Sequence, residues 1–90
     1  MLPAKRTMAL AKYAYDLGVM LPDFLQRIHI CTQEESAAVI ASGEFSLNGV
    51  ALTDPHLVIT AKMIRANSVA RYREQEVQLS LWDDYDSGLR

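Results

Sequence analysis

The segment from residue 24 to residue 55 constrains the fold most, because each of its elements carries the signal that begins or ends the next one. A short apolar helix is followed by the run Thr-Gln-Glu-Glu at 32–35, which suits the start of a second helix. Gly43 suits the end of that helix. An Asn-Gly pair at 48–49 and an Asp-Pro pair at 54–55 then mark two turns. This order predicts two helices followed by a β-hairpin.

The second helix has signals at both ends. The Thr32 hydroxyl is placed to accept from the backbone N–H of Glu35, and the Glu35 carboxylate to accept from the N–H of Thr32, which is a capping box. The residues of its predicted apolar stripe, which ends at the C-cap glycine, are Ser36, Val39, Ile40 and Gly43.

The Asn48-Gly49 pair predicts a tight hairpin, because both residues tolerate the positive backbone angles of a type I′ turn. Phe45 and Leu47 then face the core from the first arm. Further along, Val77, Leu79 and Leu81 alternate with polar residues, which predicts a strand over 76–82.

Three further segments, 4–17, 56–73 and 83–90, complete the predicted fold. Apolar residues of segment 4–17 recur every three or four positions, from Met8 to Leu17, and Gly18 follows them, so we expect an N-terminal helix there. Segment 56–73 is compatible with either a helix or a strand. Residues 83–90 are acidic and are expected to form a flexible tail. The predicted fold class is therefore α+β, with a small antiparallel sheet in one domain over 1–82.

Composition narrows the function classes. Ninety residues suit one domain with one core. The net charge of −2 lacks the basic excess of a dedicated nucleic-acid binder. Cys31 is the only cysteine, no apolar run reaches membrane-spanning length, and the first residues lack the apolar stretch of a secretory signal. We expect a cytoplasmic protein without a membrane partner.

Residues 21–55 resemble the S-four RNA-binding domain, which is named after a ribosomal protein. The domain also occurs in bacterial tyrosyl-tRNA synthetases, pseudouridine synthases and a ribosome-binding heat-shock protein. Its pattern places apolar residues on a first helix, Ser or Thr at the start of a second, Gly at its end, then Asn-Gly and Asp-Pro. The positions that match are Leu21, Phe24, Leu25, Ile28, Thr32, Glu35, Val39, Ile40, Gly43, Phe45, Leu47, Asn48, Gly49, Asp54 and Pro55. The resemblance implies a two-helix and hairpin scaffold that binds structured RNA.

The chain departs from this family where RNA is usually bound. The family places Arg or Lys before the first helix, after the capping residue and along the second helix. This chain has uncharged or acidic residues there: Met20, Gln33, Glu34, Ala37, Ala38, Ala41 and Glu44. Each lost cation removes a favourable counterion-release contribution to phosphate binding.

Two interpretations of these departures stay open. Structured RNA or a ribonucleoprotein is bound by cations elsewhere, namely Lys5, Arg6, Lys12, Lys62, Arg65, Arg71 and Arg73. Alternatively, the neutral face binds a protein through Gln33, Ala37 and Ala41, because an Ala-rich flank permits close approach. The segment around Lys62 and Arg73 is also compatible with an ordinary solvated face.

Residues 78–82 resemble the short peptide by which bacterial replication and repair proteins bind the sliding clamp. In that interpretation Gln78 anchors the peptide by hydrogen bonds, while Leu79, Leu81 and Trp82 supply the apolar contacts. The alternative, which we favour, is a last β-strand whose leucines cover the core.

The sequence argues against three other kinds of site. The two short helices also permit a DNA-reading helix-turn-helix, but Glu34 and Glu35 argue against it. Cys31 and His29 lack an orienting third group for nucleophilic catalysis. His56 has no second ligand at metal spacing. We therefore predict no catalytic residue, no metal and no cofactor.

The sequence thus predicts a small non-enzymatic binding protein. The first hypothesis is recognition of structured RNA or a ribonucleoprotein. The second is a protein-interaction adaptor or inhibitor, from a phage or other mobile element, that acts on a nucleic-acid machine such as the sliding clamp or a nuclease.

Overall fold

The computed structural model describes residues 5–64 and 67–82 and has a mixed α+β fold. Its two α-helices are α1 (Leu21–Arg27) and α2 (Ser36–Ser42), and η1 (Lys12–Tyr15) is a 3-10 helix. The strands are β1 (Lys5–Ala11), β2 (Val19–Met20), β3 (Phe45–Leu47), β4 (Val50–Ala51), β5 (Val58–Ile59), β6 (Ser68–Tyr72) and β7 (Gln75–Trp82).

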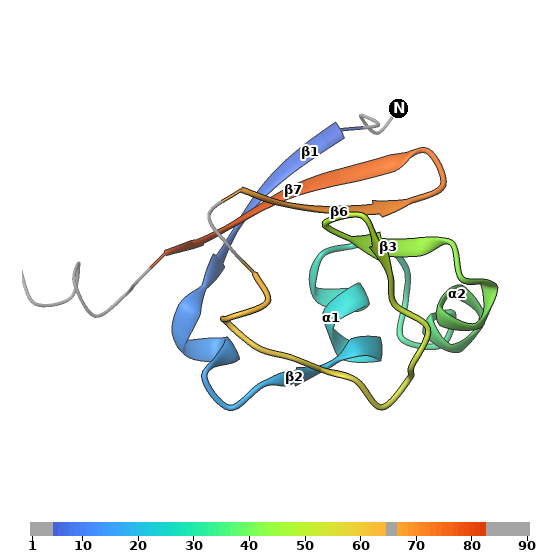
Figure 1. Cartoon of the computed structure of the whole chain (residues 1–90), viewed down its shortest axis with the longest axis horizontal. Coiled ribbons are helices and arrows are strands. Elements are labelled where there is room, and N and C mark those ends of the chain that lie inside the picture. The colour runs from blue at the N-terminus through green and yellow to red at the C-terminus, as the bar shows by residue number, and fades with distance from the viewer. Residues whose placement is uncertain (1–4, 65–66, 83–90) are drawn as a thin grey trace, which may run out of the picture.

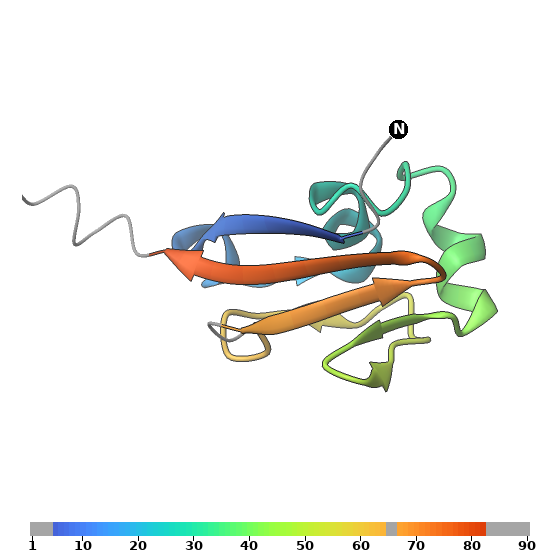
Figure 2. The same ribbon diagram turned by 90° about the horizontal axis from the view of Figure 1, so that it is seen from above.

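The strands form two separate sheets. A five-stranded sheet has the order β1-β7-β6-β3-β4, and a two-stranded ribbon joins β2 to β5. Every described pairing is antiparallel except that of β1 with β7. Figure 1 shows α1 between the large sheet and the ribbon, with α2 at one end. Figure 2 shows β1, β7 and β6 side by side across the sheet.

The core lies between the large sheet and α1. Phe24 of α1 is fully buried and makes edge-to-face contacts with Tyr15 and Phe45, at centroid distances of 6.1 and 6.4 Å. Val77 and Leu79 of β7 are also fully buried. Each of the two aromatic contacts of Phe24 adds about 0.5–1.5 kcal/mol to the stabilisation that burial alone provides. This cluster holds α1 in a fixed place beneath the sheet.

Most local predictions for residues 24–52 are confirmed, but α2 begins at Ser36 with Glu35 at its N-cap position, so the contacts between Thr32 and Glu35 close the turn before the helix. The Thr32 hydroxyl accepts from the Glu35 N–H at 3.3 Å, and the Glu35 carboxylate accepts from the Thr32 N–H at 3.0 Å. Gly43 ends α2 in the left-handed conformation, with φ 74°. Asn48 and Gly49 both have positive φ, at 53° and 84°, as a type I′ turn requires. The hairpin β3–β4 forms around them.

The predicted N-terminal helix over 4–17 is wrong. Residues 5–11 form strand β1, and only η1 is helical. The physical reason is long-range pairing: β1 runs parallel to β7, with Lys5 beside Glu76 and Leu10 beside Leu81. Leu17, expected on an apolar helix stripe, is 99% exposed.

The remaining segments follow the strand interpretation. Segment 56–73 contains β5 and β6, and no helix forms among its described residues. The strand predicted over 76–82 is confirmed as most of β7. The predicted tail, residues 83–90, lies outside the described residues. In the part of the chain that is described, no helix has the length and apolar character needed to cross a membrane.

Candidate functional site

Arg6, one of the cations predicted to bind RNA, has a structural role. Its guanidinium donates to the backbone carbonyls of Ile28 and His29, at 3.4 and 3.2 Å, and to Gln75 Oε1 at 2.9 Å. It thereby satisfies carbonyl groups that follow the C-terminus of α1. These contacts tie β1 to the chain that follows α1.

Two further predicted cations are paired with carboxylates on the surface. Arg71 Nη2 lies 2.8 Å from Glu76 Oε1. Arg73 lies 2.8 Å from Glu44, which raises the pKa of Arg73 further. The charge of each arginine is therefore balanced locally. Arg65 lies outside the described residues.

The structure brings two of the predicted lysines together. Lys12 and Lys62 line one pocket of about 490 Å³, together with Tyr15, Asp16, Thr60 and Ala61. Lys5 is exposed but begins β1, whereas Lys12 follows the other end of that strand. The predicted cations therefore do not form one continuous strip.

Residues 78–82, considered as a docking peptide, belong to β7, an interior strand of the large sheet. Both neighbours of β7, β1 and β6, are paired with it. Leu79 is fully buried and Leu81 is partly buried, while Gln78 is exposed. For Trp82 only the backbone, which ends β7, is described. This placement favours the strand interpretation of the segment.

The other predicted protein-binding residues lie together. Gln33, in the turn before α2, and Ala37 and Ala41, on α2, are all exposed. Ala37 and Ala41 are four residues apart on α2, so they lie on one side of that helix. Gln33 also lines a second pocket.

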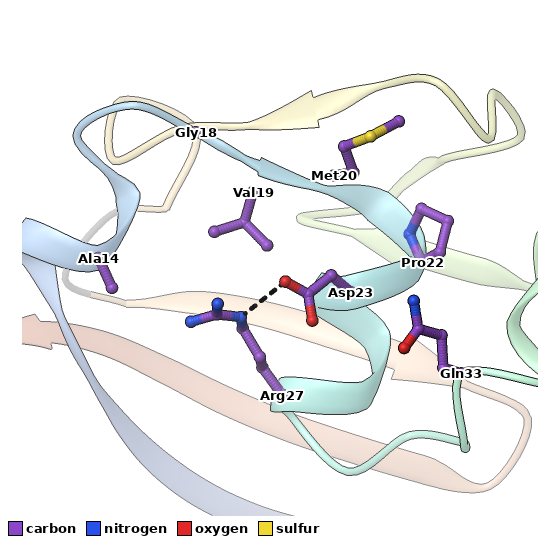
Figure 3. Close-up of a pocket in the computed structure, with 8 residues that line it drawn as sticks. All are labelled: Ala14, Gly18, Val19, Met20, Pro22, Asp23, Arg27 and Gln33. Carbon is purple, nitrogen blue, oxygen red and sulfur yellow. Dashed lines mark hydrogen bonds and ion pairs between the residues drawn. The ribbon is translucent and has the colours of Figure 1, made fainter.

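This second pocket has a volume of about 500 Å³ and lies between the loop after η1 and helix α1 (Figure 3). Arg27 Nε donates to Asp23 Oδ2 at 3.1 Å, one turn apart on α1. The side chains of Arg27 and Asp23 are 45% and 42% exposed. The residues that line the pocket are Ala14, Gly18, Val19, Met20, Pro22, Asp23, Arg27 and Gln33.

The ribbon β2–β5 is apolar on both faces. Val19 and Ile59 are paired and buried toward α1. Met20 and Val58 are paired on the opposite face, where they are 47% and 44% exposed. Leu17 precedes Gly18, and Gly18 lies against Val58. We call Leu17, Met20 and Val58 the ribbon surface.

Sequence reasoning missed the ribbon surface, because β2 and β5 are short and far apart in the chain. The usable signal is the absence of polar residues from 17–22 and 57–59. A two-stranded ribbon at a protein surface ordinarily has polar side chains on its outer face.

Two titratable side chains, those of Tyr15 and Cys31, have raised pKa values. The Tyr15 hydroxyl is buried and has no hydrogen-bond partner among the described residues. Its burial raises its pKa, which the charge of Arg27 lowers in part and that of Asp23 raises. Burial, and then the Glu35 carboxylate, raise the pKa of the Cys31 thiol, so the neutral thiol is favoured.

Comparison with known protein families and with curated proteins finds no match to this chain. Within residues 5–64 and 67–82, no three His, Cys, Asp or Glu side chains are grouped so that they could hold a metal ion.

Proposed function

We propose that this chain is a non-enzymatic protein-binding module, an adaptor or inhibitor on an S-four-like scaffold, whose partner is a protein of a nucleic-acid machine. The observation that carries this proposal is the Met20–Val58 pair on the outer face of the ribbon. Contiguous exposed apolar side chains of this kind are typical of protein interaction sites. Methionine in particular adapts to a partner surface, because its side chain is unbranched and polarisable.

Continuity with α2 supports the proposal. Met20 lines the same pocket as Gln33, and the turn that contains Gln33 leads into α2, where Ala37 and Ala41 are exposed. We call the ribbon surface, this pocket and the exposed residues Gln33, Ala37 and Ala41 together the docking surface. Small and apolar side chains cost little free energy to desolvate, so such a surface suits a protein partner better than a phosphate backbone.

The S-four-like scaffold is itself part of the proposal. It is supported by the succession of α1, α2 and the hairpin β3–β4, with the capping contact and the left-handed Gly43 between them. Met20, Gln33, Ala37 and Ala41 occupy positions where that family usually has cations. The docking surface therefore covers the region through which relatives of that kind would bind RNA.

A matched pair of variants tests this proposal. Val58→Asp places a charge on the ribbon surface, whereas Val50→Asp makes the same change at an exposed valine of the hairpin. The tagged chain is used to capture proteins from a nuclease-treated lysate, and captured proteins are identified by mass spectrometry. We expect one protein to be retained by the wild type and by Val50→Asp, and lost with Val58→Asp.

The proposal fails if capture is equal for all three proteins, or if nuclease treatment abolishes it. Circular dichroism and thermal unfolding of both variants establish that a loss of capture is not a loss of folding.

Structured RNA is the second candidate partner, favoured by the convergence of Lys12 and Lys62 on one pocket. Two lysines that line one pocket are suited to contact one phosphate or two successive phosphates. The Asp16 carboxylate on the same pocket reduces this attraction. Four arginines of the described chain, Arg6, Arg27, Arg71 and Arg73, already have partners within it.

Fluorescence anisotropy with a labelled hairpin RNA distinguishes the two candidates. RNA binding predicts an affinity that falls steeply with salt and is lost in the double variant Lys12→Ala, Lys62→Ala, but retained in Lys5→Ala. Absence of binding at low salt would leave the protein partner as the only candidate.

A further inference from the structure

We infer that the partner presents a carboxylate beside an apolar side chain, with the carboxylate bound by Arg27 and the apolar group in the adjoining pocket. This inference deepens the proposed function and rests on it, since it names the chemistry of the group that the docking surface receives. It concerns the pocket lined by Val19, Met20 and Pro22.

The Arg27 guanidinium has N–H donors that are not engaged by the described residues. Only its Nε is engaged, with Asp23 Oδ2. Among the described residues, no hydrogen bond engages its two terminal nitrogens. Figure 3 shows these nitrogens on the side of the guanidinium away from Asp23, toward Ala14 and Val19. A guanidinium has five N–H donors in a planar fork, so it can bind a second carboxylate while keeping the first.

Asp23 helps to position this arginine. The pair lies one turn apart on α1, and α1 is held in the core by fully buried Phe24 and Leu25. The guanidinium is thus held at the mouth of the pocket by an ion pair on a fixed helix. Ordering of this kind before binding reduces the entropy cost of holding a ligand.

The rest of the pocket is suited to an apolar group. Its walls include Ala14, Val19, Met20 and Pro22, and its volume of about 500 Å³ is in the range of ligand pockets. A bound apolar group would remove water from around the guanidinium, which strengthens a charge-assisted hydrogen bond. The Asp23 carboxylate repels a doubly charged anion more than a singly charged one, which favours a carboxylate over a terminal phosphate.

A small-molecule probe tests this inference without knowledge of the partner. The ¹⁵N-labelled chain is titrated with phenylacetate and, as the matched uncharged control, phenylacetamide. We expect phenylacetate to bind about fivefold more tightly or better, since hydrogen bonds between ionised groups are about twice as strong as neutral ones. The shifted signals should be those of Gly18, Met20 and the Arg27 side chain.

Two variants are expected to change this binding in opposite directions. Arg27→Gln removes the charge and should abolish the preference for phenylacetate over phenylacetamide. Asp23→Asn removes the competing charge but keeps an amide oxygen that can accept from Arg27 Nε and position it, so it should strengthen phenylacetate binding about two- to threefold, by the size of a surface ion-pair effect. Dispersed amide spectra of both variants establish that they are folded.

The inference is overturned if phenylacetate does not bind, if it binds no better than phenylacetamide, or if Arg27→Gln leaves the preference unchanged. Dimethyl phosphate that binds as tightly as phenylacetate, at the same signals, would identify a nucleic-acid backbone contact instead. These outcomes leave the proposed function standing when Val58→Asp still abolishes protein capture, so the two failures are distinguishable.

Discussion

Gly18 lies directly against Val58, so close that a Cβ at position 18 would overlap Val58 Cγ1. Gly18 also has a backbone φ of +93°, a value that residues other than glycine rarely adopt. This contact brings the loop after η1 onto strand β5. Leu17, which is 99% exposed, comes one residue before this contact and is the third member of the ribbon surface.

Gly18→Ala is expected to destabilise the fold more than Gly49→Ala. Both glycines have positive φ, but an added Cβ at Gly49 meets open space, so that variant carries only backbone strain of about 1 kcal/mol. Gly18→Ala carries the same backbone strain, and the overlap of its Cβ with Val58 costs about 1–3 kcal/mol more. Urea denaturation measures both variants. In a Val58→Ala background the additional cost should fall, and an unchanged cost would contradict the contact.

Arg6→Ala is expected to destabilise the protein by about 1.5–3 kcal/mol, because its hydrogen bonds to Gln75 and to two backbone carbonyls are charge-assisted. Lys5→Ala, one residue earlier and exposed, should leave stability within about 0.5 kcal/mol of the wild type. Thermal and urea unfolding make the comparison. Equal effects of the two substitutions would show that Arg6 has no special structural role.

Tyr15→Phe is expected to be neutral or stabilising, by up to about 1 kcal/mol. The substitution removes a buried hydroxyl that has no hydrogen-bond partner among the described residues, and it keeps the ring contact with Phe24. Denaturation of the variant checks the sign of the change. A loss of more than about 1 kcal/mol would indicate that the hydroxyl is satisfied in solution.

Glu35→Gln is expected to lower stability near neutral pH but not in acid. Hydrogen bonds from the backbone and the hydroxyl of Thr32 hold the pKa of the Glu35 carboxyl below its ordinary value of 4.5. A lowered folded-state pKa contributes stability above the unfolded value and loses it as pH falls through the folded value. The difference in Tm between wild type and variant should therefore narrow below pH 4.5. A constant difference between pH 7 and pH 3 would rule out this linkage.

Much of the fold between residues 24 and 52 was predictable, because its signals are local. A capping box, a C-terminal glycine and an Asn-Gly turn each act over about four residues. The hydrogen bonds between Thr32 and Glu35 and the positive φ of Gly43 follow directly from them. The alternation of Val77 and Leu79 likewise identified the last strand.

Long-range pairing explains what was not predictable. Segment 5–11 has residues at helical spacing, but also the period-two set Arg6, Met8 and Leu10, and only β7 decides between them. The same holds for the ribbon surface, since Met20 and Val58 are neighbours only through the pairing of β2 with β5. The hydrogen bond from Arg6 to Gln75 is not predictable for the same reason, so the sequence alone makes Arg6 a candidate for RNA binding.

Photocrosslinking from position 17 tests the protein-binding proposal most directly. Leu17 is 99% exposed, so a benzophenone amino acid there should not disturb the fold. We expect irradiation in cells to give one protein adduct that resists nuclease and is absent when the same group is placed at Val50. An adduct that nuclease digests, or no adduct from position 17, would contradict the assignment of the ribbon surface to a protein partner.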